Sequence, residues 1–289
     1  MKEIHLINIA DKNYPKSLRK IKDAPKILYY SGLLPDESKA LFAIVGTRRP
    51  SSYGQQATLQ IADELADAGI TIVSGMAPGI DTFAHKVAIE KNMPTVAVLG
   101  TGLDEKSIYP QENIALSRKI IETGGCLISE LPPGTRGTKF TFPKRNRIVS
   151  GLALGVLVIE AKEKSGSLIT ANYAKQQGKK VFAVPGQIFT LNAKGPNKLI
   201  KEGATLVNRA QDILDVLGVV PQTITKHQTF AVKNPTELAI LTALKEGSLY
   251  IDKIIEKTKL SPPVIGSTLV LMEISGKVKN LGGNTYSLN

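Results

Sequence analysis

The chain has 289 residues, 42% of them hydrophobic and 21% charged, and it carries a net charge of +12. This composition predicts a large packed core, and the excess of Lys and Arg favours a polyanionic partner such as a nucleic acid. The single cysteine, Cys126, excludes an intrachain disulfide, and the three histidines are far apart in the sequence, so neither a metal nor a cofactor is expected.

The N-terminal segment, residues 1–40, has no apolar core of the kind that a signal peptide requires. Asp-Ala-Pro and Ser-Gly sequences within it are typical of turns, and we interpret the segment as a short lead-in to the first domain. The longest apolar stretch of the chain, residues 151–161, is too short to span a bilayer. We therefore expect a cytoplasmic protein without a membrane partner.

Residues 41–218 alternate between apolar runs and helical patterns. The apolar runs are nearly continuous, which is typical of parallel strands that are covered on both faces. One intervening helical pattern ends at Gly69, a residue type common just beyond a helix. The alternation predicts an α/β domain with a doubly wound parallel sheet. The predicted strands are 41–45, 70–74, 95–99, 125–129, 155–160 and 180–184.

Ligands of open parallel sheets bind beyond the carboxyl ends of the strands, so the loops that follow the strands form the candidate site. The first loop reads GTRRPSSYG. Gly46 permits a tight turn before a helix whose amides, with Ser51 and Ser52, can bind an anion. Gly46, Thr47 and Arg48 are candidate nucleic-acid contacts, and Arg48 can hold a phosphate with two hydrogen bonds. Arginines stand where a dinucleotide fingerprint would carry glycines. The alternative is that Arg48 and Arg49 are solvated surface charges.

The next two loops are also rich in glycine. Residues 74–85 read SGMAPGIDTFAH, and the backbone of Gly75, Met76 and Ala77 offers a second close approach for a ligand. We interpret Asp81 and His85 of this stretch as structural. Residues 99–113 follow the third strand.

The loop after the fourth strand, residues 129–153, combines cations with aromatic residues. Cations neutralise phosphates and an aromatic face stacks on an unpaired base, so the combination favours single strands over duplexes. The alternatives are that one of the two phenylalanines belongs to the core and that Arg145 or Arg147 forms a structural ion pair. The residues concerned are Arg136, Lys139, Phe140, Phe142, Lys144, Arg145 and Arg147.

Ser165, Gly166 and Ser167 begin a helix after the fifth strand. Such a turn can bind an anion, although Ser also caps helices that bind no ligand. Since all these loops should meet at one sheet edge, the sequence predicts a polymeric phosphate ligand rather than a dinucleotide.

The C-terminal part differs from the rest of the chain. Residues 219–234 show no periodicity and predict a linker, whereas 235–289 predict three helices and a hairpin, the order of a small winged-helix domain. This tail has a net charge of +1, against +11 for residues 1–234. Its third helix lacks Lys and Arg, which favours a packing or protein-contact role over the reading of DNA bases.

From about Tyr14 to Leu217 the sequence resembles the DNA-processing protein A family (DprA, also called Smf). The resemblance implies an extended Rossmann-like, mainly parallel fold that binds single-stranded DNA without sequence preference, with no catalytic residues. It also implies protection of incoming strands in natural transformation, loading of a RecA-type recombinase with displacement of single-strand-binding protein, and homodimers formed through this domain. The motifs that carry it are VGTRRPSSYG, VSGMAPGIDTFAH, LGTGLDEKSIYP, SELPPG, FPKRNRIVSGLA, VIEAKEKSGSLITANYA, VFAVPG and GPNKLIKEGA.

Carried over by motif, the DNA contacts implied are Arg48, Lys139, Phe142 and the backbone of the SGMAPG turn. Arg145 and Asn146 either join them or hold their loop in shape. Many members of the family have a longer N-terminal helical domain, and here only a short segment precedes the Rossmann-like part.

Two alternatives remain open at this point. Nucleotide-cleaving phosphoribohydrolases share the architecture, but their PGGxGTxxE motif is replaced here by SGSLITANYA, which lacks the helical glutamate; Glu160 and Glu163 precede it. The second alternative is a transcription regulator that binds DNA through the tail, which the charge distribution disfavours.

Overall fold

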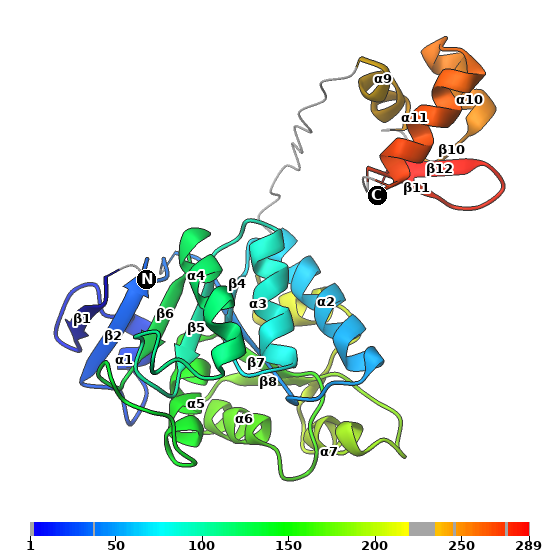
Figure 1. Cartoon of the computed structure of the whole chain (residues 1–289). Helices are drawn as coiled ribbons and strands as arrows, with labels where there is room; N and C mark the ends of the chain where they lie inside the picture. Colours follow the sequence, from blue (N-terminus) through cyan, green and yellow to red (C-terminus); the bar gives the residue numbers. More distant parts are fainter. Residues whose placement is uncertain (1–2, 37, 220–234, 245–246, 275–276, 289) are drawn as a thin grey trace. The chain divides into compact units, whose positions relative to one another are not determined.

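The computed structural model describes residues 3–36, 38–219, 235–244, 247–274 and 277–288. The chain divides into two compact units, Met1–Ile224 and Thr225–Asn289, and Figure 1 labels most of their helices and strands. The predicted linker, residues 219–234, lies outside the described residues except for Val219.

The first unit is built on a nine-stranded sheet in the order β1-β2-β6-β5-β4-β3-β7-β8-β9. From β3 the chain winds outward through β4, β5 and β6, then returns to the other side of β3 for β7, β8 and β9, with parallel pairing throughout this part. The six predicted strands are present, and the α/β doubly wound fold is confirmed. Their bounds are β3 Leu41–Val45, β4 Thr71–Ser74, β5 Thr95–Leu99, β6 Cys126–Ser129, β7 Gly155–Val158 and β8 Lys180–Ala183. A seventh parallel strand, β9 Thr205–Leu206, was not predicted.

The strands are apolar throughout because helices cover both faces of the sheet. Phe42 and Ile44 of β3 face one helical layer, and the alternate residues Ala43 and Val45 face the other. Figure 1 shows the two layers, with α2, α3 and α4 on one side and α5, α6 and α7 on the other. The helices are α2 Ser52–Asp67, α3 Ile80–Glu90, α4 Ile114–Glu122, α5 Thr141–Leu152, α6 Gly166–Gln176, α7 Lys194–Lys201 and α8 Ala210–Leu217, with short 3-10 turns η1 Gln111–Asn113 and η2 Leu191–Ala193.

The segment interpreted as a lead-in forms part of the sheet. Strands β1 (His5–Asn8) and β2 (Ile27–Gly32) extend it beyond β6 in antiparallel pairing, and a short helix α1 (Lys16–Arg19) packs against α5. Tyr14 is buried, and its hydroxyl donates to the Pro25 carbonyl at 2.7 Å. These strands were missed because only Ile7 of β1 and only Leu28 and Ser31 of β2 are buried, so neither gives the continuous apolar run that marks the parallel strands.

The second unit is a winged helix, as predicted. Three helices enclose an apolar core with a three-stranded sheet in the order β10-β12-β11. The turn between the last two strands contains Gly282, Gly283 and Asn284, all with positive φ. The elements are α9 Pro235–Leu244, β10 Leu249–Tyr250, α10 Ile251–Thr258, α11 Pro262–Ile274, β11 Val278–Asn280 and β12 Thr285–Leu288.

Within the described ranges, every helix is too short or too polar to cross a membrane.

Candidate nucleic-acid interface

The loops that follow β3, β4, β5, β6, β7 and β8 enclose one pocket, which we call the carboxyl-edge pocket. Its volume is about 1710 Å³, above the range of roughly 300–1,000 Å³ that is usual for small-molecule sites. The chain reverses its winding direction between β3 and β7, which is where ligands bind in such sheets. Of the predicted residues, those that line the pocket are Gly46, Thr47, Arg48, Gly75, Ala77, Lys139, Phe142, Arg145, Asn146, Ser165, Gly166 and Ser167.

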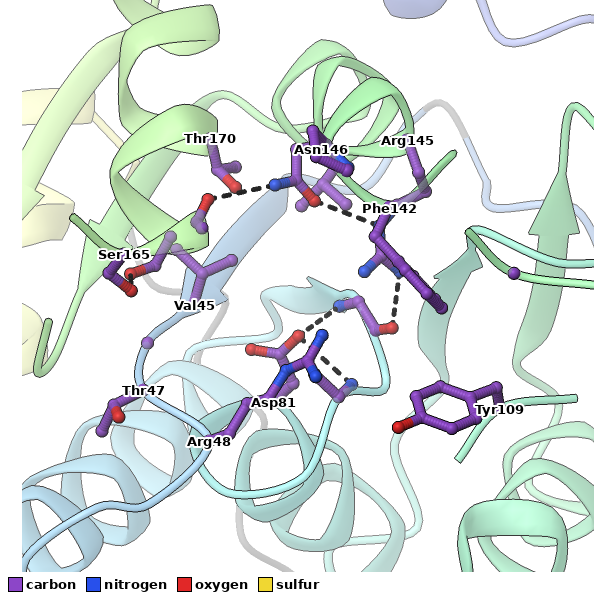
Figure 2. Close-up of a pocket in the computed structure, with 18 of the residues that line it drawn as sticks. Val45, Thr47, Arg48, Asp81, Tyr109, Phe142, Arg145, Asn146, Ser165 and Thr170 are labelled. Carbon is purple, nitrogen blue, oxygen red and sulfur yellow. Dashed lines mark hydrogen bonds between the residues drawn. The ribbon is translucent and has the colours of Figure 1, made fainter. Parts of the chain in front are cut away.

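The aromatic end of the pocket is formed by Phe142 and Tyr109, whose ring centroids lie 5.6 Å apart with the planes tilted by 49°. The Arg48 guanidinium approaches from the loop after β3, with its Cζ 5.9 Å from the Phe142 centroid, within the range of a cation–π contact. Figure 2 shows these three side chains around the same space. The pocket therefore joins an accessible aromatic ring to a cation from a loop about ninety residues earlier in the sequence.

Gly137 makes room for the Phe142 ring. A Cβ at position 137 would lie 2.4 Å from Cζ of Phe142, so any larger residue displaces the ring. Neither phenylalanine of this loop joins a buried core cluster: Phe142 is half-buried at the pocket, and Phe140 is 73% exposed beneath the Lys139 ammonium, at 5.1 Å. The alternative that one of the two phenylalanines is a core residue is therefore wrong.

Arg145 is a buried residue of the pocket floor, and its hydrogen bonds connect α5 to the ends of β4 and β5. Its Nη1 donates to the carbonyl oxygens of Gly75, at 2.5 Å, and Val98. A Cβ on Gly75 would meet both Arg145 Nη2, at 2.6 Å, and Asp81 Oδ2, at 2.7 Å, so the glycine lets these opposite charges approach from either side. Burial lowers the pKa of Arg145 to about 10, which keeps the side chain cationic at neutral pH.

Asp81 is the acid that balances Arg145. Its Oδ2 accepts from the backbone N–H groups of Gly75, at 3.1 Å, and Ala77, at 3.4 Å, and so holds the turn that follows β4. Burial raises the pKa of Asp81, against the lowering effect of Arg145. Met76 has φ of 59° in this turn, and its side chain is buried in the core instead of lining the pocket. The structural interpretation of Asp81 fits these contacts.

The start of α6 forms another wall. Asn146 accepts from Arg145 Nε at 3.1 Å and donates through Nδ2 to the Gly166 carbonyl at 3.1 Å, which ties α5 to α6. The hydroxyls of Ser165 and Ser167 are paired at 2.9 Å, and Ser165 does not cap the helix through its side chain. The helix N-terminus faces the pocket with its positive dipole end available to an anion.

The start of α2 is different. The buried carboxylate of Glu160 accepts from Ser51 N at 2.9 Å and from Ser51 Oγ at 2.6 Å. The N-terminus of α2, which we expected to bind an external anion, therefore binds the carboxylate of Glu160 instead.

Lys144 is a predicted site residue that lies outside the pocket. Its ammonium is 3.2 Å from a carboxylate oxygen of Glu130, which also pairs with Arg147 at 2.5 Å. On α5, Phe142, Arg145 and Asn146 share one face at helical spacing, and Lys144 falls on another. The alternative of a structural ion pair is correct for Arg147.

Several residues of the pocket were not predicted as its ligand contacts. Tyr109 and Lys106 come from the loop after β5, and Lys162 and Lys164 from the loop after β7. Their signal was a basic or aromatic residue in a loop that follows a strand. Seven exposed cations line the pocket: Arg48, Arg49, Lys106, Arg136, Lys139, Lys162 and Lys164. Within the described parts of the chain, none of the seven forms a salt bridge, and Asp81 is the only acidic residue that lines the pocket.

Comparisons with known proteins extend these observations. The family model described as DNA recombination-mediator protein A matches residues 5–218, and the DprA winged helix domain matches residues 226–284. Protein Smf of Escherichia coli (strain K12) is 36% identical over 291 residues, which cover 98% of this chain and 77% of that protein.

Two solved structures are similar to about three quarters of the chain. DNA processing protein A from Streptococcus pneumoniae matches with a TM-score of 0.68 and 40% identity over 74% of each chain. DNA processing protein A from Helicobacter pylori matches with a TM-score of 0.65 and 32% identity, over 75% of this chain and 96% of that one, and that structure concerns its single-stranded DNA binding mode.

Proposed function

The chain belongs to the DNA recombination-mediator protein A family, and from this premise we propose that it binds single-stranded DNA without sequence preference in the carboxyl-edge pocket. The observation that carries the proposal is the half-buried Phe142 ring among seven exposed cations, in a pocket larger than a nucleotide needs. The relative from Helicobacter pylori, whose single-stranded DNA binding mode has been described, supports it.

In this proposal the phosphates bind the cationic side chains and the N-terminus of α6, while a base stacks on Phe142. Stacking needs an unpaired base, because the faces of paired bases are covered by their neighbours in a duplex. Phosphate contacts and stacking are available to every nucleotide, so the binding does not depend on sequence. Arg145 and Asp81 act as positioning residues beneath the strand.

The test compares oligo-dT with a hairpin duplex of the same number of nucleotides. The proposal predicts that an unlabelled single strand displaces fluorescent dT12 at a lower concentration than the duplex does. Equal displacement by both, or stronger displacement by the duplex, contradicts it.

Family membership also supports a wider role. The protein protects incoming single strands in the cytoplasm during natural transformation, loads a RecA-type recombinase onto them with displacement of single-strand-binding protein, and acts as a homodimer through its first unit. Strand exchange by the recombinase on DNA coated with single-strand-binding protein should accelerate when the protein is added. An unchanged rate contradicts the loading role, and a monomeric mass in analytical ultracentrifugation contradicts the dimer.

The proposed role involves no catalysis. Glu160, the buried acid nearest to the position of the phosphoribohydrolase glutamate, is bonded to Ser51, and Asp81 is bonded to the backbone of its own turn. Incubation with nucleoside monophosphates should release no free base. Release of base would instead support the phosphoribohydrolase alternative.

For the winged helix we propose a protein contact rather than the reading of DNA bases. Helix α11 carries no Lys or Arg, and its exposed side chains include Val270 and Leu271. Deletion of residues 219–289 should therefore leave the affinity for oligo-dT unchanged. A large loss of affinity in the shortened chain contradicts this assignment.

A further inference from the structure

Phe189 is the most exposed large hydrophobic side chain in the described part of the protein. It is 93% exposed, and its neighbour Ile188 is 74% exposed. A single exposed apolar residue is common on a protein surface. Two consecutive exposed apolar side chains beside a charged pocket, one of them an aromatic ring with both faces open, indicate an interaction site.

The turn that carries Phe189 is anchored on both sides. The N–H of Thr190 donates to the Gln187 carbonyl at 3.0 Å, which closes a turn with Ile188 and Phe189 at its tip. Asn197 of α7 both donates to the Gly186 carbonyl, at 2.9 Å, and accepts from the Gly186 N–H, at 3.1 Å. The ring is thus presented on a fixed support, which lowers the entropy cost of using it to bind a ligand.

The same segment continues directly into the carboxyl-edge pocket. Thr190, Leu191 and Asn192 line the pocket. Asn192 donates to the Arg49 carbonyl at 3.2 Å, and its own carbonyl accepts from Ala161 N at 2.7 Å. The turn is therefore joined to the loops after β3 and β7, which carry other cations of the pocket.

The position of the turn suits a strand that leaves the aromatic end. Tyr109 follows β5 and Phe189 follows β8, and these strands are four neighbours apart in the sheet, on the order of 19 Å at about 4.8 Å per strand. Lys162 and Lys164 line the pocket from the loop after β7, the strand next to β8. Cations thus lie between two aromatic positions, at a separation that several nucleotides cover.

We propose that Phe189 is a second base-stacking platform, which receives a nucleobase of the strand after it has crossed from Phe142 along Lys162 and Lys164. This inference rests on the proposed single-strand binding and adds a direction and a minimum length to it. A dinucleotide held at Phe142 does not reach Phe189, whereas a strand of twelve nucleotides contacts both rings.

The experiment is a titration of the full-length protein with fluorescent dT2, dT4, dT6, dT8 and dT12, followed by anisotropy. For the wild type, affinity should rise in a step once the strand reaches Phe189. F189A should remove the step, weaken dT12 binding by roughly 5- to 150-fold and leave the shortest oligonucleotides within twofold of wild type. Because the ring is exposed, the melting temperature should not change.

Two further variants separate stacking from a general apolar contact. F189W should restore tight dT12 binding, and F189L should behave like F189A, because leucine has no aromatic face. L33A is the matched control: Leu33 is also exposed, but it follows β2 at the opposite edge of the sheet, where Gly32 pairs with the first residue of β6. Its dT12 affinity should equal that of the wild type.

The outcomes distinguish the two proposals. Full dT12 affinity in F189A or in F189L, or an equal loss for all lengths, overturns the second platform but leaves the proposed function intact. Absence of dT12 binding in the wild type overturns both. A change in the oligomeric state of F189A without DNA, measured by ultracentrifugation, assigns the ring to a contact between protein copies and overturns the inference.

Discussion

The salt dependence of single-strand binding follows from the charges that line the carboxyl-edge pocket. Seven exposed cations line it. If each neutralises one phosphate, the logarithm of the affinity falls with the logarithm of the salt concentration with a slope of about −5, at about −0.7 per phosphate of a single strand. Between 50 and 200 mM salt the affinity for dT12 should then fall roughly a thousandfold.

Charge variants make the prediction specific to the pocket. K162A combined with K164A should reduce the slope to between about −3 and −4, because two phosphate contacts are lost. K39A combined with K180A is the matched control, since these exposed lysines precede β3 and begin β8 at the opposite edge of the sheet. Fluorescence anisotropy of labelled dT12 at five salt concentrations gives each slope. A nearly flat wild-type dependence, or an equal change in both double variants, refutes the reasoning.

Four further predictions concern individual side chains. F142A should weaken dT12 binding by about 1–3 kcal/mol through the loss of a stacked base; calorimetry that finds wild-type affinity returns Phe142 to a structural role. G137A should displace the Phe142 ring and weaken binding without a change in melting temperature, and tight binding by this variant would show that the ring position is unimportant. D81N leaves Arg145 buried without its balancing charge, so the free energy of unfolding in urea should fall by about 3–5 kcal/mol; a loss below about 1 kcal/mol contradicts this pairing. Burial lowers the pKa of His85 from 6.5 to about 3, so between these values only the unfolded state takes up this proton. As the pH is lowered from 6.5 towards 3, the free energy of unfolding should decrease by up to about 1.4 kcal/mol per pH unit; an identical pH profile for H85Q contradicts this origin.

The surroundings of the two His85 ring nitrogens explain why the neutral ring is preferred. The Thr95 hydroxyl donates to the Ile72 carbonyl at 2.7 Å, so its oxygen accepts from Nδ1–H of His85 at 2.8 Å. Nε2 is buried without a hydrogen-bond partner in the described structure. A proton on Nε2 would add a charge in the core near Arg145, whose guanidinium lowers the pKa further.

The fold could be predicted wherever burial leaves a simple pattern in the sequence. Strand β3 reads LFAIV because each of its faces packs against a helical layer. Strand β2 contains Tyr29 and Tyr30, which are half-buried, and β9 has two residues. Short strands with few buried residues differ little from loops in sequence, so β1, β2 and β9 were found only in the structure.

The site was predictable to the level of loops, and less so to the level of side chains. Topology requires the loops to meet at one edge, and the family resemblance singled out Arg48 and Phe142 within them. The orientation of Lys144 depends on where α5 begins, and the approach of Tyr109 to Phe142 depends on tertiary packing. The hydrogen bond from Ser51 to Glu160, which lies 109 residues away in the sequence, leaves no local signal in the sequence.

The proposed binding of single-stranded DNA relies most directly on Arg48 and Lys139, which come from different loops and line the same pocket as Phe142. The decisive measurement is the affinity of the full-length R48A/K139A variant for dT12 at 150 mM salt, with K39A/K180A as the control. Loss of two charged phosphate contacts predicts a decrease of more than about a hundredfold, with an unchanged melting temperature and a control close to wild type. Wild-type affinity in R48A/K139A would show that single-stranded DNA does not bind in the carboxyl-edge pocket.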